Sequence, residues 1–452
     1  MFAEMLISLA LFLLLYYSFF GLYNYYYGIA SFFRRKLPTV KPSGKPVAIV
    51  IVSFNEEHVI ADTIKQCEAL SYKHKVIIVG DDSNDGRTYP ILLEIAKKKG
   101  CKKITNSILT HEGTVEIWES PHFVLFHRNS NAGFKAGNLK AMEDYLRAKE
   151  FPYMYLLDAD WWPQKDAIER CMEVIEANEK LAYVQTKRVS YHGKMDIWER
   201  SLALGEDGCY YADLAGRAAV GDMILFTGCC TLFRMSALYH AKGFAPGHLT
   251  EDVDLSNRLY LRGYKGAYLE DVSNEGEVPP HYHAYRRQQE RWTMGTARTL
   301  RAYFLPIIES KKINFMEKMS MLRQNSYYTG AIAVELSIIL AFLSTILLTF
   351  GRDSVEAAAF EYYFGFIGLS YSVVIVIMLA SNFIGPLVVA LKRRSIMHFL
   401  YAPLSTWLSW SLLHTYFIAN IKGFFNIKRD WFVTPKGMRK KVKHSGGHAH
   451  HI

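Results

Sequence analysis

Residues 153–163 read YMYLLDADWWP, and this stretch decides how the rest of the chain is interpreted. Apolar residues run into Asp158 and Asp160, and two tryptophans and a proline follow at once. The apolar run predicts a buried strand. On an extended chain, side chains two residues apart point to the same side, so both carboxylates would crowd one face where the strand ends. We therefore expect a compensating cation at this strand end.

Short apolar segments alternate with amphipathic stretches of helical length from Pro46 to about Arg301. Helical patterns occur, for example, in residues 56–70 and 164–180. The alternation predicts an α/β domain in which a parallel sheet carries helices on both faces. Polar residues gather at the strand ends, where open α/β sheets bind ligands. The expected strands are residues 47–54, 75–82, 123–128, 153–160 and 182–188.

Hydrophobic runs of membrane-spanning length flank this region. Residues 5–30 contain a single Asn as their only strongly polar residue and are long enough for a hydrocarbon core of about 30 Å. A secretory signal is the alternative, but no basic stretch precedes the run and no small-residue cleavage site follows it. Basic residues at 34–36 place the following domain in the cytoplasm. Residues 327–350 and 362–391 can each span a bilayer as well.

Positive charge is concentrated beside these runs. The net charge is +10, with basic residues at 392–394 and from Lys422 to Lys443. Nucleic-acid binding is an alternative, but a position beside membrane segments favours contact with anionic lipid. The sequence therefore predicts membrane lipid, and no nucleic acid, as a partner.

Acidic residues recur at expected strand ends and at a helix start. Asp81 and Asp82 close the strand at 75–82, and Glu251 and Asp252 begin a later helix. Mg²⁺ takes one or two carboxylates and completes its shell with substrate phosphate oxygens. Together with Asp158 and Asp160, these residues indicate a metal-bridged nucleotide diphosphate. Aspartates that only cap turns are the structural alternative.

A segment rich in small residues, NSNAGFKAGNLKAM at 129–142, places Lys135 at the start of a helix. Backbone N–H groups and a lysine at such a position can bind phosphate. A loop that uses glycine only for backbone freedom explains the segment equally well.

The segment YRRQQERWTMG at 285–295 supplies Arg286, Arg287 and Arg291, whose guanidinium groups suit phosphates. Trp292 adds a flat apolar face on which a sugar or a base can stack. A solvated basic helix with an anchoring tryptophan is the simpler alternative.

Taken together, these motifs resemble those of membrane-integrated family 2 glycosyltransferases, the group with cellulose, hyaluronan, chitin and mannan synthases. The resemblance covers nearly the whole chain, and its last motif looks like the gating loop of cellulose-synthase-like enzymes. The matching motifs are SFNEE (53–57), DDSNDG (81–86), DAD (158–160), FTGCCTLFR (226–234), TED (250–252), QQERW (288–292) and WFVTPKG (431–437).

The resemblance implies a Rossmann-like GT-A domain in the cytoplasm, inserted between transmembrane helices of the plasma membrane. It implies Mg²⁺ or Mn²⁺ on Asp160, a UDP- or GDP-linked sugar donor, and Asp252 as the general base of an inverting hexosyl transfer. The acceptor residues would be Glu251, Gln288 and Trp292. With Lys135, the donor residues would be Phe54, Glu56, Asp81 or Asp82, Asp158, Asp160, Arg291, Thr434 and Lys436.

The resemblance also bears on organisation. If WFVTPKG reaches a cytoplasmic site, residues 396–425 must lie in the membrane interface or re-enter without crossing, and we expect the interfacial position. Trp161 stands where cellulose synthases tend to carry histidine, and it could line a sugar pocket or anchor a loop. The expected units are a membrane helix (1–36), the catalytic domain (37–305), an interfacial segment (306–326), transmembrane and interfacial helices (327–425), and a gating loop with a basic tail (426–452).

Three functions are compatible with these motifs. The first is extension of a β-linked polysaccharide coupled to its secretion, which the QQERW motif and the gating loop favour. The second is transfer of a single sugar to a polyprenyl phosphate or a ceramide-like lipid. The third, a non-enzymatic sugar-nucleotide sensor, gives no reason for a carboxylate placed as a base.

Overall fold

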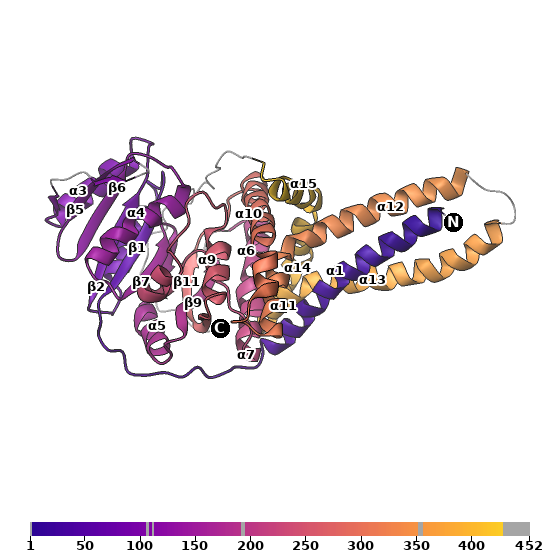
Figure 1. Ribbon diagram of the computed structural model, residues 1–452, viewed down its shortest axis with the longest axis horizontal. Helices are drawn as coiled ribbons and strands as arrows, with labels where there is room; N and C mark the ends of the chain where they lie inside the picture. Colours follow the sequence, from indigo (N-terminus) through magenta and orange to yellow (C-terminus); the bar gives the residue numbers. More distant parts are fainter. Residues whose placement is uncertain (1, 105–107, 111–112, 191–194, 351–355, 428–452) are drawn as a thin grey trace.

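The computed structural model describes residues 2–104, 108–110, 113–190, 195–350 and 356–427. The chain forms a sheet domain from which an arm of three long helices extends (Figure 1). Short helices fill the junction between the sheet domain and the arm.

The sheet has the strand order β3-β5-β6-β2-β1-β7-β10-β9-β11-β8, with β4 paired to β5. Its strands are β1 (Val47–Ser53), β2 (Lys75–Asp81), β3 (Lys102–Lys103), β4 (Ile108–Thr110), β5 (Gly113–Glu119), β6 (Phe123–Arg128), β7 (Tyr153–Asp158), β8 (Trp161–Pro163), β9 (Leu181–Ser190), β10 (Thr231–Arg234) and β11 (Lys265–Gly276).

All of the strands expected from the sequence are present, but the prediction of a parallel sheet is only partly correct. The central pairs β1 with β2, β1 with β7 and β2 with β6 are parallel, as is β9 with β11. Strand β10 runs antiparallel to both of its neighbours, and β5 runs antiparallel to β6. A short strand such as β10 has little apolar pattern, so its insertion between β7 and β9 was not predictable from periodicity.

Helices cover both faces of the sheet, as predicted. In β1, Val47, Ile49 and Ile51 belong to one apolar core, and Ala48 and Val50 belong to the other. The first core includes side chains of α2 (Ile60–Glu68), α3 (Thr88–Lys98) and α5 (Ala167–Glu176). The second core includes side chains of α4 (Phe134–Ala148), η1 (Cys209–Leu214), α7 (Ala215–Val220), α8 (Met235–His240), α9 (Glu251–Tyr260), α10 (Tyr282–Glu309) and α11 (Phe315–Asn325).

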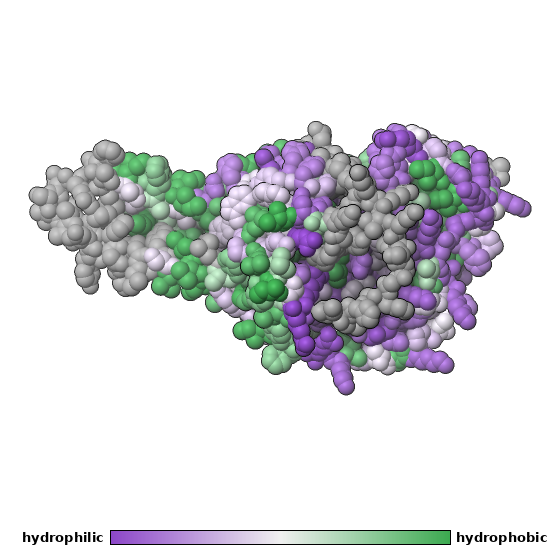
Figure 2. All heavy atoms as spheres, turned by 180° about the vertical axis from the view of Figure 1, so that it is seen from behind, coloured by the Kyte–Doolittle hydropathy of each residue, from purple (hydrophilic) through white to green (hydrophobic). Residues whose placement is uncertain are grey.

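The arm consists of α1 (Phe2–Ala30), α12 (Gly330–Phe350), which follows the short turn η2 (Tyr327–Thr329), and α13 (Glu356–Lys392). Three segments in the described chain are long and apolar enough to cross a membrane: Met5–Ala30, Tyr327–Leu347 and Ser372–Lys392. Figure 2 shows apolar residues on the coloured part of the arm, next to the junction, and hydrophilic residues over much of the visible sheet domain. This distribution is that of a membrane protein, as the sequence predicts.

Two short helices lie at the junction. They are α14 (Ile396–Trp410), which packs on α6 (Ile197–Gly208), and α15 (Leu413–Phe424), which packs on α10. With 15 and 12 residues, neither reaches the roughly 20 residues that a span requires. The interfacial position predicted for residues 396–425 fits these lengths and stays a prediction.

Basic residues at the end of α13 bind the sheet domain. Lys392 Nζ lies 2.7 Å from Glu270 Oε1, and Arg393 forms an ion pair of 2.7 Å with Asp207 Oδ2. Two of the charges attributed to lipid contact from the sequence, those of Lys392 and Arg393, are thus paired with protein carboxylates. The C-terminal end of α13 is therefore the end of this helix that contacts the sheet domain.

Candidate active site

A cavity of about 200 Å³ lies where the central strands end, between the sheet and helices α6, α9 and α10. We call one side the strand-end wall; it consists of Phe54, Glu56, Asp82, Asp158 and Asp160. We call the opposite side the helical wall; it consists of Glu206, Glu251, Asp252, Gln288, Arg291 and Trp292.

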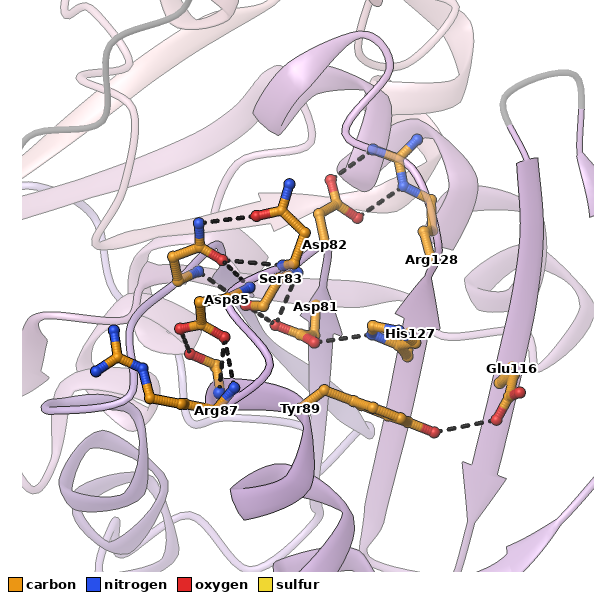
Figure 3. Close-up of polar contacts among 12 residues, drawn as sticks. Asp81, Asp82, Ser83, Asp85, Arg87, Tyr89, Glu116, His127 and Arg128 are labelled. Carbon is orange, nitrogen blue, oxygen red and sulfur yellow. Dashed lines mark hydrogen bonds and ion pairs between the residues drawn. The ribbon is translucent and has the colours of Figure 1, made fainter.

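The two aspartates that follow β2 point in different directions. Asp82 lines the cavity and is held by buried Arg128, which donates from Nε to Oδ1 at 2.8 Å and from a terminal nitrogen to Oδ2 at 2.5 Å. Asp81 does not line the cavity; it accepts from Ser83 Oγ and lies 2.8 Å from His127 Nδ1 (Figure 3). Of the predicted pair, only Asp82 can contact a ligand in this cavity.

The ionised form of Asp82 is disfavoured by burial, although Arg128 is its partner. Burial raises the pKa of Asp82 to about 6, and the hydrogen bonds and charge of Arg128 limit that rise. A buried carboxyl beside a fixed guanidinium is a preformed hydrogen-bonding group.

Lys135 joins the two walls. Its ammonium lies 2.5 Å from Asp158 Oδ1 and 3.6 Å from Glu251 Oε1, and it donates to the carbonyl oxygen of Gly228 at 2.7 Å. Burial alone would lower the pKa of Lys135, but the nearby carboxylates raise it above its ordinary value. The lysine therefore stays charged and supplies part of the compensation expected for Asp158.

Asp252 occupies the first turn of α9, where its Oδ1 accepts from the backbone N–H of Val253 at 2.9 Å. Burial and the neighbouring charge of Glu251 raise the pKa of Asp252 to about 7, against weaker opposing effects of Lys135 and Arg291. A general base works best when its pKa lies near the working pH. The group is therefore suited to proton transfer at neutral pH.

Helix α10 brings Gln288, Arg291 and Trp292 to the cavity and is fixed against the turn that precedes α9. A terminal nitrogen of Arg291 donates to the carbonyl oxygen of Leu249 at 3.2 Å. A Cβ atom at Gly295 would come within 2.5 Å of the Thr250 side chain, so this close approach requires glycine. Contact between α9 and α10 thus sets the position of Asp252.

Not all of the predicted basic residues reach the cavity. Arg291 lines it, whereas Arg286 is exposed and Arg287 lies 3.7 Å from Glu290 on the same helix. Of these three arginines, Arg291, the one predicted to bind the donor, is placed to meet a phosphate in this cavity. Thr434 and Lys436 lie outside the described residues.

The carboxylates suit a hard cation that is shared with substrate. No group of three or more His, Cys, Asp or Glu residues stands close enough to hold a metal ion in the described ranges. Mg²⁺ typically takes one or two carboxylates and completes its shell with phosphate oxygens and water. Asp158 and Asp160 offer such oxygen ligands in the cavity wall.

Three charged residues of the cavity were not predicted, namely Arg188, Glu206 and Glu277. Arg188 closes the strand expected at 182–188, so the strand-end argument could have identified it. Glu206 lies inside α6, where no motif marks it. Burial raises its pKa to about 7, Arg188 lowers it, and the charges of Asp207 and Asp160 raise it.

Trp161 acts as an anchor in this structure. Strand β8 pairs with β11, which sets Gly276 opposite Trp161, and a Cβ at Gly276 would meet the indole at 2.4 Å. The Arg188 guanidinium lies over the indole at 4.1 Å from its centroid, and only 4% of Trp161 is exposed. The indole supports Arg188 and also lines the cavity, with little of its surface exposed.

Comparison with known proteins fits this site. The description "Glycosyl transferase family 2" matches residues 48–241, and "Glycosyl transferase family group 2" matches residues 153–425. A solved mannosyltransferase from Pyrobaculum calidifontis, in complex with GDP-Man and Mn²⁺, superposes with a TM-score of 0.60 at 17% identity, over 94% of this chain and all of that one. This likeness establishes a common fold, the GT-A fold.

Curated relatives include a probable glucomannan 4-beta-mannosyltransferase 11 of Oryza sativa subsp. japonica, 28% identical over 64% of this chain and 48% of the relative. Glucomannan 4-beta-mannosyltransferase 2 of Arabidopsis thaliana is also 28% identical, over 61% of this chain and 49% of the relative. The chain thus spans about half the length of these relatives. Because the family match covers more than half of the chain and includes every residue of the helical wall, this protein belongs to glycosyl transferase family group 2.

Proposed function

We propose that this protein transfers a sugar from a nucleotide-diphosphate sugar to a growing β-linked polysaccharide, with inversion at the anomeric carbon. The observation that carries the proposal is the position of Asp252. A carboxyl group with a pKa of about 7 lines the same cavity as Asp82, Asp160 and Arg291. A base, a group for the nucleotide and charged groups for a diphosphate then share a single cavity.

On the donor side, Phe54, Glu56 and Asp82 would hold the base and ribose. Lys135 and Arg291 would face the diphosphate, whose negative charge they can stabilise as it leaves. A divalent cation on Asp160, with Asp158 beside it, would supply further positive charge to the leaving group. The names of the curated relatives point to mannose, and the GDP-Man of the solved mannosyltransferase makes GDP-mannose the first donor to test.

On the acceptor side, Gln288 and Trp292 would position the acceptor sugar and Glu251 would contact it. Asp252 would take the proton of the acceptor hydroxyl as that oxygen attacks the anomeric carbon and the nucleoside diphosphate leaves. A single displacement of this kind inverts the anomeric configuration.

Topology supports coupling to the membrane. The basic residues at 34–36 and 392–394 favour a cytoplasmic sheet domain, and the plasma membrane is the expected location. The predicted closure by Thr434 and Lys436 remains part of this proposal.

The test uses the purified full-length protein in lipid nanodiscs with GDP-mannose, UDP-glucose and UDP-N-acetylglucosamine, with Mg²⁺ or Mn²⁺. Nucleoside diphosphate release and product size are measured. A high-mass, glycosidase-sensitive product supports the polysaccharide function, and an organic-extractable monoglycosylated lipid supports the single-transfer alternative instead. The test variant is D160A in the cavity, and its matched control is D62A on the exposed surface of α2. Release that D160A leaves unchanged would contradict the proposal.

A further inference from the structure

Glu206 is the helical-wall residue that the proposed mechanism leaves without a role. Its Oε1 atom is buried and has no hydrogen-bond partner in the described part of the chain. A buried carboxylate oxygen without a partner is costly, so native proteins seldom retain one without a reason. Because Glu206 lines the cavity, a bound ligand can supply the missing donor.

The surroundings of Glu206 define where that ligand group lies. The charges with the largest effect on the pKa of Glu206 are those of Arg188, Asp207 and Asp160. Asp207 is itself engaged, because it accepts from the backbone N–H of Ser190 and pairs with Arg393. Glu206 therefore shares with Asp160 a part of the cavity in which Arg188 supplies the positive charge.

Arg188 is held rigidly beside Glu206. Its guanidinium lies over Trp161 and, at 5.6 Å, over Tyr210, and it donates to the carbonyl oxygen of Thr227 at 3.1 Å. These contacts fix the positive charge of Arg188 near Glu206. That charge partly compensates a carboxylate at this position in the cavity wall. In the same helical wall, Gln288 Oε1 is also buried without a hydrogen-bond partner in the described ranges.

The ligand group that can donate a hydrogen bond to Glu206 Oε1 is limited by its chemistry. A phosphate group is excluded as a partner because it would place two anions in contact. Asp158, Asp160 and Glu206 do not form a metal-holding group in the described structure, so a cation bound by all three is disfavoured. A neutral hydroxyl group is the donor that a buried acceptor oxygen requires, and it is the group that sugars carry in abundance.

We propose that Glu206 is a specificity-determining residue whose carboxylate accepts a hydrogen bond from one hydroxyl group of a sugar bound in the cavity. This inference rests on the proposed function and adds a recognition role to it. The hydroxyl belongs either to the donor hexose or to the acceptor saccharide, since both meet in this cavity. A site built to bind a hydroxyl rejects an analogue that lacks it, because the buried acceptor is then left unpaired.

The experiment compares wild type with E206A, E206Q and the exposed control E94Q on α3. The donor is the one that the nucleotide-release screen identifies, offered with its monodeoxy analogues, and a short oligosaccharide acceptor is offered in parent and monodeoxy forms. We expect E206A to lower kcat/KM for the parent sugar by about 10- to 100-fold. E206Q, which keeps an acceptor oxygen, should recover part of the loss.

The decisive readout is discrimination. Wild type should prefer the parent sugar to one particular monodeoxy analogue, and E206A should lose that preference while its affinity for the nucleoside diphosphate stays unchanged. Loss of preference among donor analogues assigns the hydroxyl to the donor, and loss among acceptor analogues assigns it to the acceptor.

An E206A variant that discriminates every analogue as wild type does would overturn the inference. A changed Mn²⁺ or Mg²⁺ requirement in E206A would overturn it as well, by making Glu206 a metal ligand. If wild type releases no nucleoside diphosphate from any donor, it is the proposed function that fails, and the two failures are thus distinguishable.

Discussion

The two walls of the cavity are built by different physical means. In the strand-end wall, parallel register places neighbouring positions side by side: Ser53 pairs with Asp81, and Val52 pairs with Asp158. Residues that follow these strands must therefore meet at the same edge of the sheet. The helical wall has no such register, and its residues meet only because α6, α9 and α10 pack in one particular way.

The walls also differ in how their charges are compensated. Asp82 has a dedicated partner in Arg128, and Asp158 has one in Lys135. Asp252 and Glu206 are half-buried without comparable ion pairs in the described chain, and desolvation raises the pKa of each to about 7. The strand-end wall is thus suited to holding a ligand, and the helical wall is suited to moving a proton and recognising hydroxyl groups.

The largest expected effect comes from removing the base in the helical wall. D252N should lower kcat by about 10²- to 10⁴-fold, because general-base catalysis typically contributes that much. Nucleoside diphosphate affinity, measured by calorimetry, should stay near that of wild type because the strand-end wall is intact. D62N on the surface of α2 is the control. An active D252N would assign the base to another residue.

A second effect concerns pH. Asp252 accepts a proton only when ionised, so kcat/KM should fall about tenfold per unit as the pH drops below about 7. Since the charge of Glu251 raises the pKa of Asp252, E251Q should move this limb of the profile to lower pH. Rate profiles of both proteins at saturating metal check this. A limb that stays in place in E251Q would show that another group titrates.

The strand-end wall should respond in binding and less in turnover. D82N removes the charge that Arg128 fixes in the cavity, and we expect a rise of about 10- to 100-fold in the dissociation constant for the nucleoside diphosphate. D81N is the matched control, because its side chain bonds His127 outside the cavity. It should leave that constant unchanged. Equal effects of the two variants would contradict the division between these aspartates.

A smaller effect tests the coupling of the helical wall to the arm. A Cβ at Gly208, two residues after Glu206, would lie 3.1 Å from the Cα of Gly385 in α13. G208V should push α6 away from α13 and slow transfer by about tenfold, since small displacements of positioned groups reduce turnover. Nucleotide affinity should not change. An unaltered rate would show that α6 does not depend on this contact.

Much of the strand-end wall was predictable because its signals are local. Apolar runs identify β1, β2 and β7, and the polar residues that follow them are the ones that line the cavity. Even there, the sequence does not show which of Asp81 and Asp82 lines the cavity, because that depends on the neighbouring residues His127 and Arg128. The antiparallel insertion of β10 also carried no periodic signal.

Local patterns are enough to predict the α/β class, the hydrophobic spans and the carboxylates of the strand ends, because periodicity and strand-end position are properties of short segments. What compensates those carboxylates depends on residues that the fold brings together from distant parts of the chain. Within the YMYLLDADWWP stretch, Lys135 from α4 holds Asp158, and Trp161 supports Arg188 from β9. The fold also determines that Glu206 faces the cavity, because the sequence of a helix does not show which neighbouring element its buried side contacts.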